Sequence, residues 1–170
     1  IPNDSPAETR TVIHDVKCSM ALEHTIRENG GIPHMMRTGH SFLKQALREM
    51  PGCPLAGEMS GHFFFNDRWN GFDDALYAAA RILPLVPTLD TLNQTLPSYP
   101  STPELRLPID EEQKWNIVPR LKPKLKDYTL NETDGIHLSN ENGWALIRPS
   151  NTEACISLRI EAKTTENLQR

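Results

Sequence analysis

The sequence TVIHDVKCSMALEHTIRENGGIPHMM, residues 11–36, decides the fold class of the first part of the chain. It opens with the apolar and β-branched run TVIHDV, residues 11–16, which is typical of a buried strand. It closes with IPHMM, residues 32–36, which we interpret as a second strand. The segment between the two runs has helical spacing. A strand–helix–strand unit of this kind predicts parallel strands with the helix packed over them.

The helix between these runs has a beginning and an end in the sequence. Ser19 offers a hydroxyl that can cap the first turn. Leu22 and Ile26 lie four residues apart, which is the spacing of one helix face, so we expect both to point inward. Gly30 and Gly31 then supply the C-terminal stop.

The alternation of strands and helices continues beyond this unit. Ser41 is expected to cap a second helix, and residues 53–56 are expected to form a third strand. Asp73 or Asp74 then opens a third helix over residues 75–83. The pattern predicts an α/β domain with a mixed, mostly parallel sheet and covering helices.

Prolines separate this domain from a smaller one. Eight of the 14 prolines fall between Pro84 and Pro123, a stretch that we expect to hold connectors and short elements. The predicted domains are residues 1–98 and 99–170, the second of class α+β with an antiparallel sheet and a closing helix that the chain does not complete. Its expected elements are a strand over 104–109, a helix over 111–122, and strands over 136–138, 144–147 and 155–160.

Composition excludes several classes of protein. The chain has 170 residues, 38% of them apolar, and a formal net charge of −4, which is ordinary for a globular protein. The acidic balance argues against general nucleic-acid binding, and the apolar runs are far shorter than the roughly 20 residues of a membrane helix. Three widely spaced cysteines, Cys18, Cys53 and Cys155, favour a reducing, cytoplasmic compartment over a disulfide framework.

A first candidate site follows the third strand, in the loop GEMSGH, residues 57–62. Ligands of open α/β sheets bind beyond the carboxyl ends of strands. The two glycines allow a sharp turn, and between them stand Glu58 and Ser60. A carboxylate accepts hydrogen bonds from two vicinal hydroxyls, which suits a sugar. The alternative is a plain turn with a solvated carboxylate.

A second candidate site is the loop RPSNT, residues 148–152. It offers a guanidinium fork, two hydroxyls and an amide. We also expect several of its backbone N–H groups to be free. Such groups bind phosphate through bidentate charge-assisted bonds and a backbone nest. The alternative is a polar hairpin turn with a surface arginine.

Four motifs in order resemble the α-D-phosphohexomutase family, and most closely its bacterial phosphomannomutase/phosphoglucomutase branch. The loop over residues 57–62, here called the sugar loop, and the following FFF (63–65) and RWNGFDD (68–74) resemble the family's sugar-recognition segment. GWALIRPSNT (143–152) resembles its phosphate loop. DVKCS and RTGHS lie at the spacing of that branch. The resemblance covers nearly the whole chain, which is similar to the third of four domains and most of the fourth.

The resemblance implies an enzyme that moves a phosphoryl group between the 1- and 6-positions of a hexose through a bisphosphorylated intermediate. It implies Mg²⁺ and a hexose 1,6-bisphosphate as cofactor and intermediate, and mannose or glucose phosphates as substrates. The phosphoserine loop and the metal loop of the family's first two domains are absent from this sequence. No metal ligand is therefore expected in this chain, and its partners would be the missing N-terminal domains.

The resemblance also implies roles for particular residues. Glu58 and Ser60 would hold the sugar's 3- and 4-hydroxyls, while the role of Arg37, where the branch often has lysine, stays open. The residues implied to bind the non-transferred phosphate are Arg148, Ser150, Asn151 and Thr152. The residues implied to line the cleft, as phosphate contacts or proton-transfer groups, are Lys17, His40 and His62.

Two functional hypotheses follow. In the first, the chain is the C-terminal part of a phosphohexomutase and is inactive alone, because phosphoryl transfer needs a positioned nucleophile and usually a metal. In the second, it is a stand-alone, non-catalytic module that binds sugar phosphates. A scaffold without a ligand is the weaker third interpretation.

Overall fold

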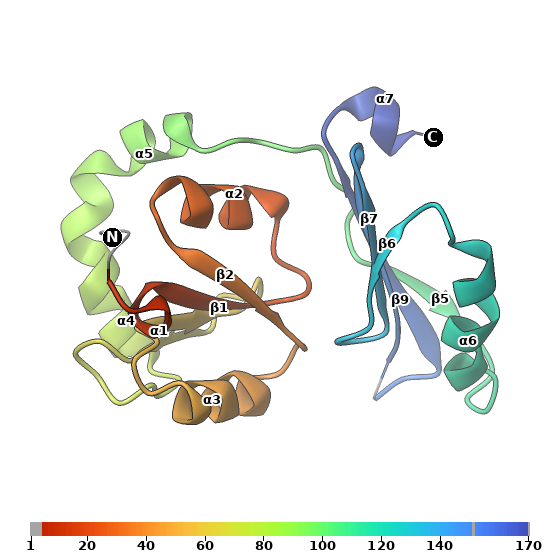
Figure 1. Cartoon of the computed structure of the whole chain (residues 1–170), viewed down its shortest axis with the longest axis horizontal. Helices are drawn as coiled ribbons and strands as arrows, with labels where there is room; N and C mark the ends of the chain where they lie inside the picture. The colour runs from red at the N-terminus through yellow and green to blue at the C-terminus, as the bar shows by residue number, and fades with distance from the viewer. Residues whose placement is uncertain (1–4, 151, 170) are drawn as a thin grey trace. The chain divides into compact units, whose positions relative to one another are not determined.

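The computed structural model describes residues 5–150 and 152–169. Two compact units are formed, one up to Ser98 and one from Tyr99 onward (Figure 1). The first carries a mixed sheet with helices, and the second carries an antiparallel sheet, which confirms the predicted fold class.

The first unit is built on a four-stranded sheet in the order β2-β1-β3-β4. The central strand β1 pairs in parallel with β2 and β3, and β3 turns back into the antiparallel β4. The chain moves from β1 to β2 in one direction and from β2 to β3 in the other. Right-handed crossovers then place the helices α2 and α3 on opposite faces of the sheet (Figure 1). The strands are β1 (Thr11–Asp15), β2 (Ile32–Met36), β3 (Leu55–Gly57) and β4 (Phe63–Phe65).

The helices of the first unit begin close to where the sequence predicts. Ser19 caps α2 by accepting a hydrogen bond from the Ala21 N–H, and Asp74 caps α4. The expectation that Leu22 points inward is wrong, because its side chain is exposed and only Ile26 of that pair is buried. The helices are α1 (Ala7–Arg10), α2 (Met20–Glu28), α3 (His40–Glu49), α4 (Ala75–Ile82) and α5 (Leu89–Thr95), with the 3₁₀ helix η1 (Leu83–Thr88) between the last two.

The start of α3 differs from the prediction. Ser41 was expected to cap this helix, but it lies inside it, and Gly39 occupies the cap position with φ +133°. The Gly39 N–H donates instead to the carboxylate of Glu58, 2.9 Å away. A carboxylate from another loop therefore takes the place of a local capping side chain.

The core of the first unit lies between α3 and the sheet. Phe64 at the centre of β4 is fully buried there, although its strand is too short for the sequence to reveal. The third strand starts at Leu55 rather than Cys53, whose N–H closes a turn on Met50. The buried cluster consists of Ile13, Leu43, Ala46, Leu47, Cys53, Ala56 and Phe64.

The second unit is a five-stranded antiparallel sheet in the order β5-β9-β8-β7-β6. The predicted helix over 111–122 is broken into a 3₁₀ turn, one short helix and a second 3₁₀ turn, since Pro119 and Pro123 interrupt the ladder. The elements are β5 (Leu105–Pro108), η2 (Lys114–Asn116), α6 (Ile117–Leu121), η3 (Lys122–Lys124), β6 (Thr129–Asn131), β7 (Ile136–Asn140), β8 (Gly143–Pro149), β9 (Cys155–Ala162) and α7 (Thr165–Leu168).

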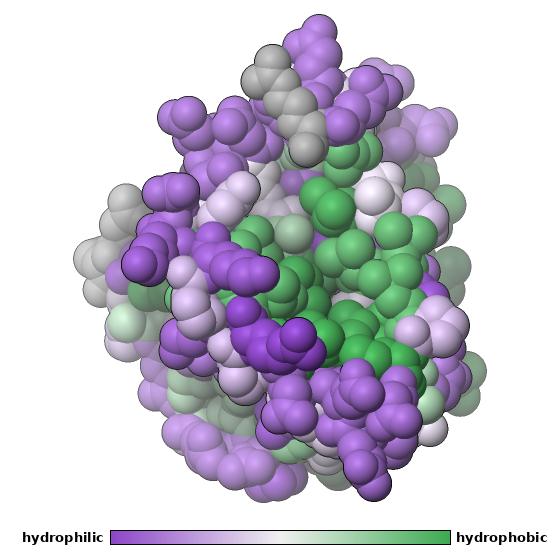
Figure 2. Space-filling view, turned by 90° about the vertical axis from the view of Figure 1, so that its right-hand side faces the viewer, coloured by the Kyte–Doolittle hydropathy of each residue, from purple (hydrophilic) through white to green (hydrophobic). Residues whose placement is uncertain are grey.

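The two faces of this sheet differ in polarity. Ile156 and Leu158 on β9 and Ile147 on β8 face the side on which α6 packs, and Figure 2 shows apolar side chains gathered on that side. The opposite face carries Arg148 and Ser157, which lie side by side in the register of β8 and β9. The candidate phosphate loop joins these two strands.

In the part of the chain that the structure describes, none of the helices has the length and apolar character of a membrane span.

Candidate functional site

The sugar-loop candidate is a tight hairpin between β3 and β4. The Glu58 N–H donates to the His62 carbonyl, and the Gly61 N–H donates to the Glu58 carbonyl, both at 3.0 Å. Gly61 adopts φ +91°, a conformation that favours glycine. The hairpin starts at the carboxyl end of β3, which is where the ligands of open α/β sheets bind.

Within this hairpin the structure brings Glu58 and Ser60 together. The Ser60 hydroxyl donates to Glu58 Oε2 at 2.9 Å, while Oε1 accepts from the Gly39 N–H at the start of α3. The Glu58 side chain is buried, and the helix N-terminus favours its negative charge. Each carboxylate oxygen keeps lone pairs for further donors, so the pair can accept the hydroxyls of a sugar.

Asp15 fixes the loops that surround Glu58, and its role could not be predicted from the sequence. The residue is 1% exposed, and its carboxylate accepts from the Met59 N–H at 3.3 Å and the Thr38 hydroxyl at 3.2 Å. It also accepts from the Cys18 thiol at 3.1 Å. Asp15 thereby ties together the segments that follow β1, β2 and β3. The signal in the sequence is a single carboxylate at the end of an apolar run.

Cys18 is a protonated thiol in this arrangement. Burial raises its pKa far above the usual value, and the neighbouring carboxylate of Asp15 raises it further. A thiol with a raised pKa is a poor nucleophile. Cys18 therefore acts as a hydrogen-bond donor to Asp15 in this structure.

The three predicted cleft residues each follow one strand of the parallel trio. Lys17 lies in the turn after β1, His40 begins α3 after β2, and His62 lies in the hairpin after β3. The carboxyl ends of parallel strands meet at one edge of a sheet, so all three lie at the edge that carries Glu58. His62 is half exposed, and its Nδ1 lies 2.9 Å from the carboxylate of Asp73. Their catalytic roles stay predictions.

In the second unit, Arg148 lies near the end of β8 on the polar face of the sheet. Its Nε is 3.4 Å from Oδ2 of Asp134, and both side chains are nearly buried, at 12% and 8% exposure. Gly135 packs against the backbone of β8 at Arg148, where a Cβ would come within 2.4 Å of the Ile147 carbonyl oxygen. The Asp134 carboxylate thus lies against one side of the guanidinium, while Gly135 allows the backbone next to Asp134 to approach β8 closely.

The loop after Arg148 is closed by its own hydrogen bonds. Ser150 Oγ accepts from the N–H groups of Thr152 and Glu153, at 3.3 and 3.1 Å, and the Ser150 N–H donates to the Cys155 carbonyl. The expectation of several free N–H groups in residues 148–152 is therefore wrong for Ser150 and Thr152. Among the described residues of the loop, anion recognition therefore falls mainly to side chains. Asn151, predicted as a phosphate ligand, lies outside the described residues.

Two further arginines share the polar face with Arg148. Arg106 of β5 stands opposite Ser157 of β9, which stands opposite Arg148, and Arg159 lies two residues along the same strand. Within the described part of the chain, the buried Nε of Arg159 has no hydrogen-bond partner. Strand alternation in the sequence would have placed Arg159 on this face, but nothing in the sequence marked it as unpartnered.

Metal-ligating side chains do not gather in the described residues. No group of three or more histidine, cysteine, aspartate or glutamate side chains there is placed to hold an ion. Cys18, Cys53 and Cys155 are all free. The donor sets of both loops, cationic and hydroxyl-bearing apart from Glu58, fit a phosphorylated sugar better than a divalent cation.

Comparisons with known proteins match this chain to one family along nearly its whole length. The family model for phosphoglucomutase/phosphomannomutase alpha/beta/alpha domain III matches residues 3–100, and the model for the C-terminal domain matches residues 104–170. A phosphomannomutase/phosphoglucomutase of Pseudomonas syringae pv. tomato is 41% identical over 94% of this chain. A phosphoglucomutase of Neisseria gonorrhoeae is 40% identical.

A solved structure supports the same match. The phosphoglucomutase/phosphomannomutase family protein from Burkholderia thailandensis superposes with a TM-score of 0.85 at 40% identity and covers 96% of this chain. The chain covers only 35% of the Pseudomonas protein and 37% of the Burkholderia chain. It therefore spans about a third of the length of the relatives that it matches.

Proposed function

Because the chain belongs to the phosphoglucomutase/phosphomannomutase family, we propose that it is the C-terminal part of an enzyme interconverting hexose 1-phosphate and hexose 6-phosphate. The reaction would pass through a bisphosphorylated intermediate. This part supplies the recognition of sugar hydroxyls and of the non-transferred phosphate. The observation that carries the proposal is the pairing of the Glu58 carboxylate with the Ser60 hydroxyl, held at the sheet edge where open α/β sheets bind their ligands.

The residues of the first unit would bind the sugar ring. Glu58 accepts hydrogen bonds from two neighbouring hydroxyls, and Ser60 can exchange its bond to Glu58 for one to the ligand. A contact with the 3- and 4-hydroxyls leaves the 2-position untouched. Since glucose and mannose differ only there, such a site accepts both. Lys17, His40 and His62 line the same edge as positive or proton-bearing groups near a phosphate.

The second unit would anchor the phosphate that is not transferred. Arg148 supplies a guanidinium whose direction is set by Asp134, and Ser150 and Thr152 supply hydroxyl donors. Ser150 uses its oxygen as an acceptor within the loop, which leaves its O–H free to donate to a phosphate oxygen. Asn151 belongs to the same proposed set. An anchor of this kind holds the ligand in either of its two orientations.

Mg²⁺ and hexose 1,6-bisphosphate belong to the proposal as cofactor and intermediate of the whole enzyme. No cluster in the described residues suits Mg²⁺, so we assign no residue of this chain to it. The metal ion, when bound, offsets the charge that develops during phosphoryl transfer. The phosphoserine and the metal loop would come from N-terminal domains, the principal partners of this part.

Isothermal titration calorimetry with mannose 1-phosphate and glucose 1-phosphate tests this proposal. We expect both sugars to bind, and we expect Arg148→Ala to abolish the binding of either. Arg120→Ala is the matched control, because Arg120 is exposed on α6, and it should leave the affinity unchanged. Absence of binding to either sugar phosphate would refute the recognition role.

A coupled assay separates the proposal from an autonomous enzyme. The isolated chain is expected to show no mutase turnover, and turnover would overturn the assignment of the phosphoserine and metal loops to other domains. The alternative of a stand-alone binding module shares the calorimetric result. The reading frame upstream distinguishes the two, since only the first hypothesis requires it to encode both loops.

A further inference from the structure

Lys114 is a buried lysine that the sugar-phosphate function does not by itself require. Its side chain is 1% exposed, although lysine is among the residues most rarely buried. It lies in η2, between β5 and α6. Its ammonium is 2.6 Å from the carboxylate of Glu111 and 5.0 Å from the ring centroid of Trp115.

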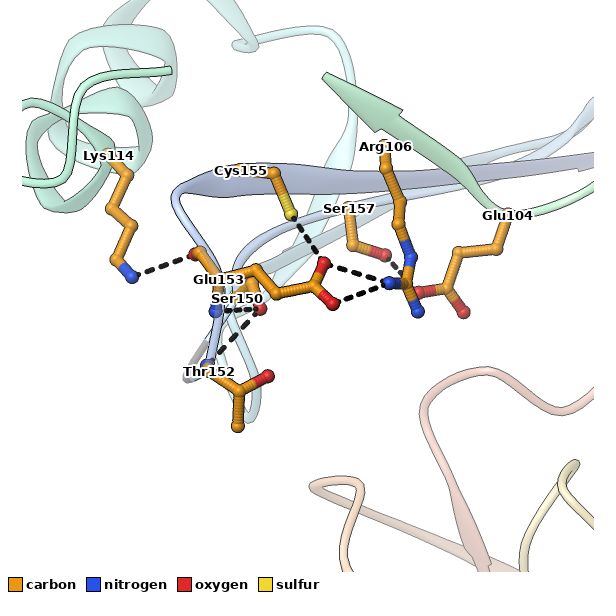
Figure 3. A network of polar contacts seen from close by, with 8 residues as sticks. All are labelled: Glu104, Arg106, Lys114, Ser150, Thr152, Glu153, Cys155 and Ser157. Atoms are coloured by element: carbon orange, nitrogen blue, oxygen red, sulfur yellow. Dashed lines mark hydrogen bonds and ion pairs between the residues drawn. The ribbon is translucent and has the colours of Figure 1, made fainter. Parts of the chain in front are cut away.

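The third group around this ammonium belongs to the connection between β8 and β9, directly after the candidate phosphate loop of residues 148–152. Lys114 Nζ donates to the backbone carbonyl of Glu153 at 3.0 Å, across 39 residues of sequence (Figure 3). Burying an ammonium is unfavourable unless its donors are matched by acceptors. An apolar side chain would have served to pack η2 against the sheet. The lysine adds a charge-assisted hydrogen bond to a specific point of the loop backbone.

Glu153 is held at its side chain as well. Both of its carboxylate oxygens accept from Nη1 of Arg106, at 2.9 and 2.8 Å, and the Cys155 thiol lies 3.7 Å from one of them (Figure 3). Arg106 thereby neutralises a carboxylate that stands beside a proposed phosphate site. The side-chain pair is exposed, so its contribution to stability is small, whereas the bond from Lys114 is partly buried and starts from a fully buried side chain.

The position of the Glu153 carbonyl affects the ligand-binding groups directly. The peptide N–H of the same residue donates to Ser150 Oγ, and the Cys155 N–H donates back to the Glu153 carbonyl. Fixing that carbonyl therefore fixes the hydroxyl of Ser150 and the turn that carries Thr152. The loop's internal bonds close the turn, and Lys114 sets where the turn lies relative to the sheet.

We propose that Lys114 is a positioning residue for the phosphate loop, and that its buried ammonium holds residues 149–150 and 152–155 in the conformation that binds phosphate before the ligand arrives. The inference rests on the proposed function for the identity of the ligand, a phosphorylated sugar. Lys114 itself does not touch the ligand. It acts through the Glu153 carbonyl and, from there, through Ser150.

The substitution Lys114→Met tests this, because it keeps most of the apolar stem and removes the ammonium. Calorimetry with mannose 1-phosphate is expected to show a dissociation constant about ten-fold higher, the effect of losing one charge-assisted hydrogen bond. Lys114→Arg keeps the charge and should restore the affinity to within about three-fold. Lys122→Met removes an exposed lysine that pairs with Glu132 and serves as the matched control, with no change expected.

Hydrogen exchange supplies the readout that general destabilisation would not reproduce. In Lys114→Met, the amides of Ser150, Thr152 and Glu153 are expected to exchange about ten times faster, while those in the middle of β9 keep their rates. This measurement needs no ligand, so it tests the inference even if the chain binds no sugar phosphate. Should Lys114→Met fail to fold, Lys114→Gln is judged by the same criteria. Unchanged loop exchange in a folded variant would overturn the proposal, as would an affinity equal to that of the unaltered chain.

Discussion

Replacing Glu23 with glutamine is expected to remove a pH-dependent part of the stability of the first unit. Glu23 lies on α2, and its Oε1 is 3.3 Å from Nε2 of His14, a buried side chain of β1. Its Oε2 is 2.7 Å from the guanidinium of Arg27, one turn along the helix. The carboxylate thus joins the helix to the central strand beneath it.

The magnitude follows from the titration of this carboxyl. The contact with His14, 3.3 Å away, is the largest cause that lowers the pKa of Glu23 from 4.5 to about 2; burial opposes the shift, and Arg27 adds to it. A pKa lowered in the folded state adds stability above the pKa of the unfolded chain, and the added stability disappears as the pH falls toward the folded pKa. The window is therefore pH 4.5 down to about 2. At pH 7, the full shift of the pKa corresponds to at most about 3 kcal/mol of folding stability.

Urea unfolding at pH 7, 5, 3 and 2, followed by the methyl resonances of Ile13, reads the first unit separately. At pH 7, the free energy of unfolding of the first unit should be about 2–3 kcal/mol higher in the unaltered chain than in Glu23→Gln. This difference should disappear as the pH falls below 3. Glu28→Gln is the control, since its pair with His24 on the same helix is exposed on both sides. A difference that stays constant from pH 7 to pH 2 would refute the reasoning.

Two other predictions follow from buried contacts. Asp15→Asn should destabilise the first unit by about 2–4 kcal/mol, because the amide cannot accept all the donors around it, and should speed the exchange of the Met59 amide; an unchanged urea midpoint would contradict this. Gly135→Ala should lower the stability of the second unit by about 2–4 kcal/mol, since φ is +75° and the new Cβ meets the Ile147 carbonyl at 2.4 Å. Gly61→Ala, with φ +91° and open space around its Cβ, should cost only about 1–2 kcal/mol, and equal losses at the two glycines would count against the steric argument.

Much of the fold could be predicted because its main strands are apolar runs with clear ends. The runs over 11–16 and 32–36 became β1 and β2, and the alternation of Ile156 and Leu158 gave the face of β9 correctly. Two of the strands with only three residues, β4 and β6, were missed, because so short a run shows no periodicity. Such strands depend on pairing with a neighbour, which local sequence does not report.

The start of α3 shows why local signals can mislead. Ser41 has the right chemistry for a cap, yet Glu58, 19 residues beyond Gly39, supplies the oxygen that the Gly39 N–H needs. The carboxylate brings its own charge to the helix N-terminus, which a hydroxyl does not. A tertiary contact therefore replaced the local one.

Some residues of the candidate site could likewise be predicted from the sequence, and others could not. Glu58, Ser60 and Arg148 were found from residue type and position in a loop, and their roles as ligands remain predictions. Asp15 and Lys114 were not found, because a charged residue usually lies at the surface and nothing in one sequence marks it as buried. Their importance lies in what they hold in place, and only the folded backbone reveals which loop that is.

The attachment of Glu153 limits how far the second unit could be cut down. Its two cationic partners, Lys114 and Arg106, come 39 and 47 residues earlier in the chain. A fragment starting at β6, or a β8–β9 hairpin grafted onto another scaffold, would contain every residue of the loop over 148–152. It would nonetheless lack both cations that hold the loop. The smallest transferable piece therefore begins at β5, well before the motif by which the loop is recognised.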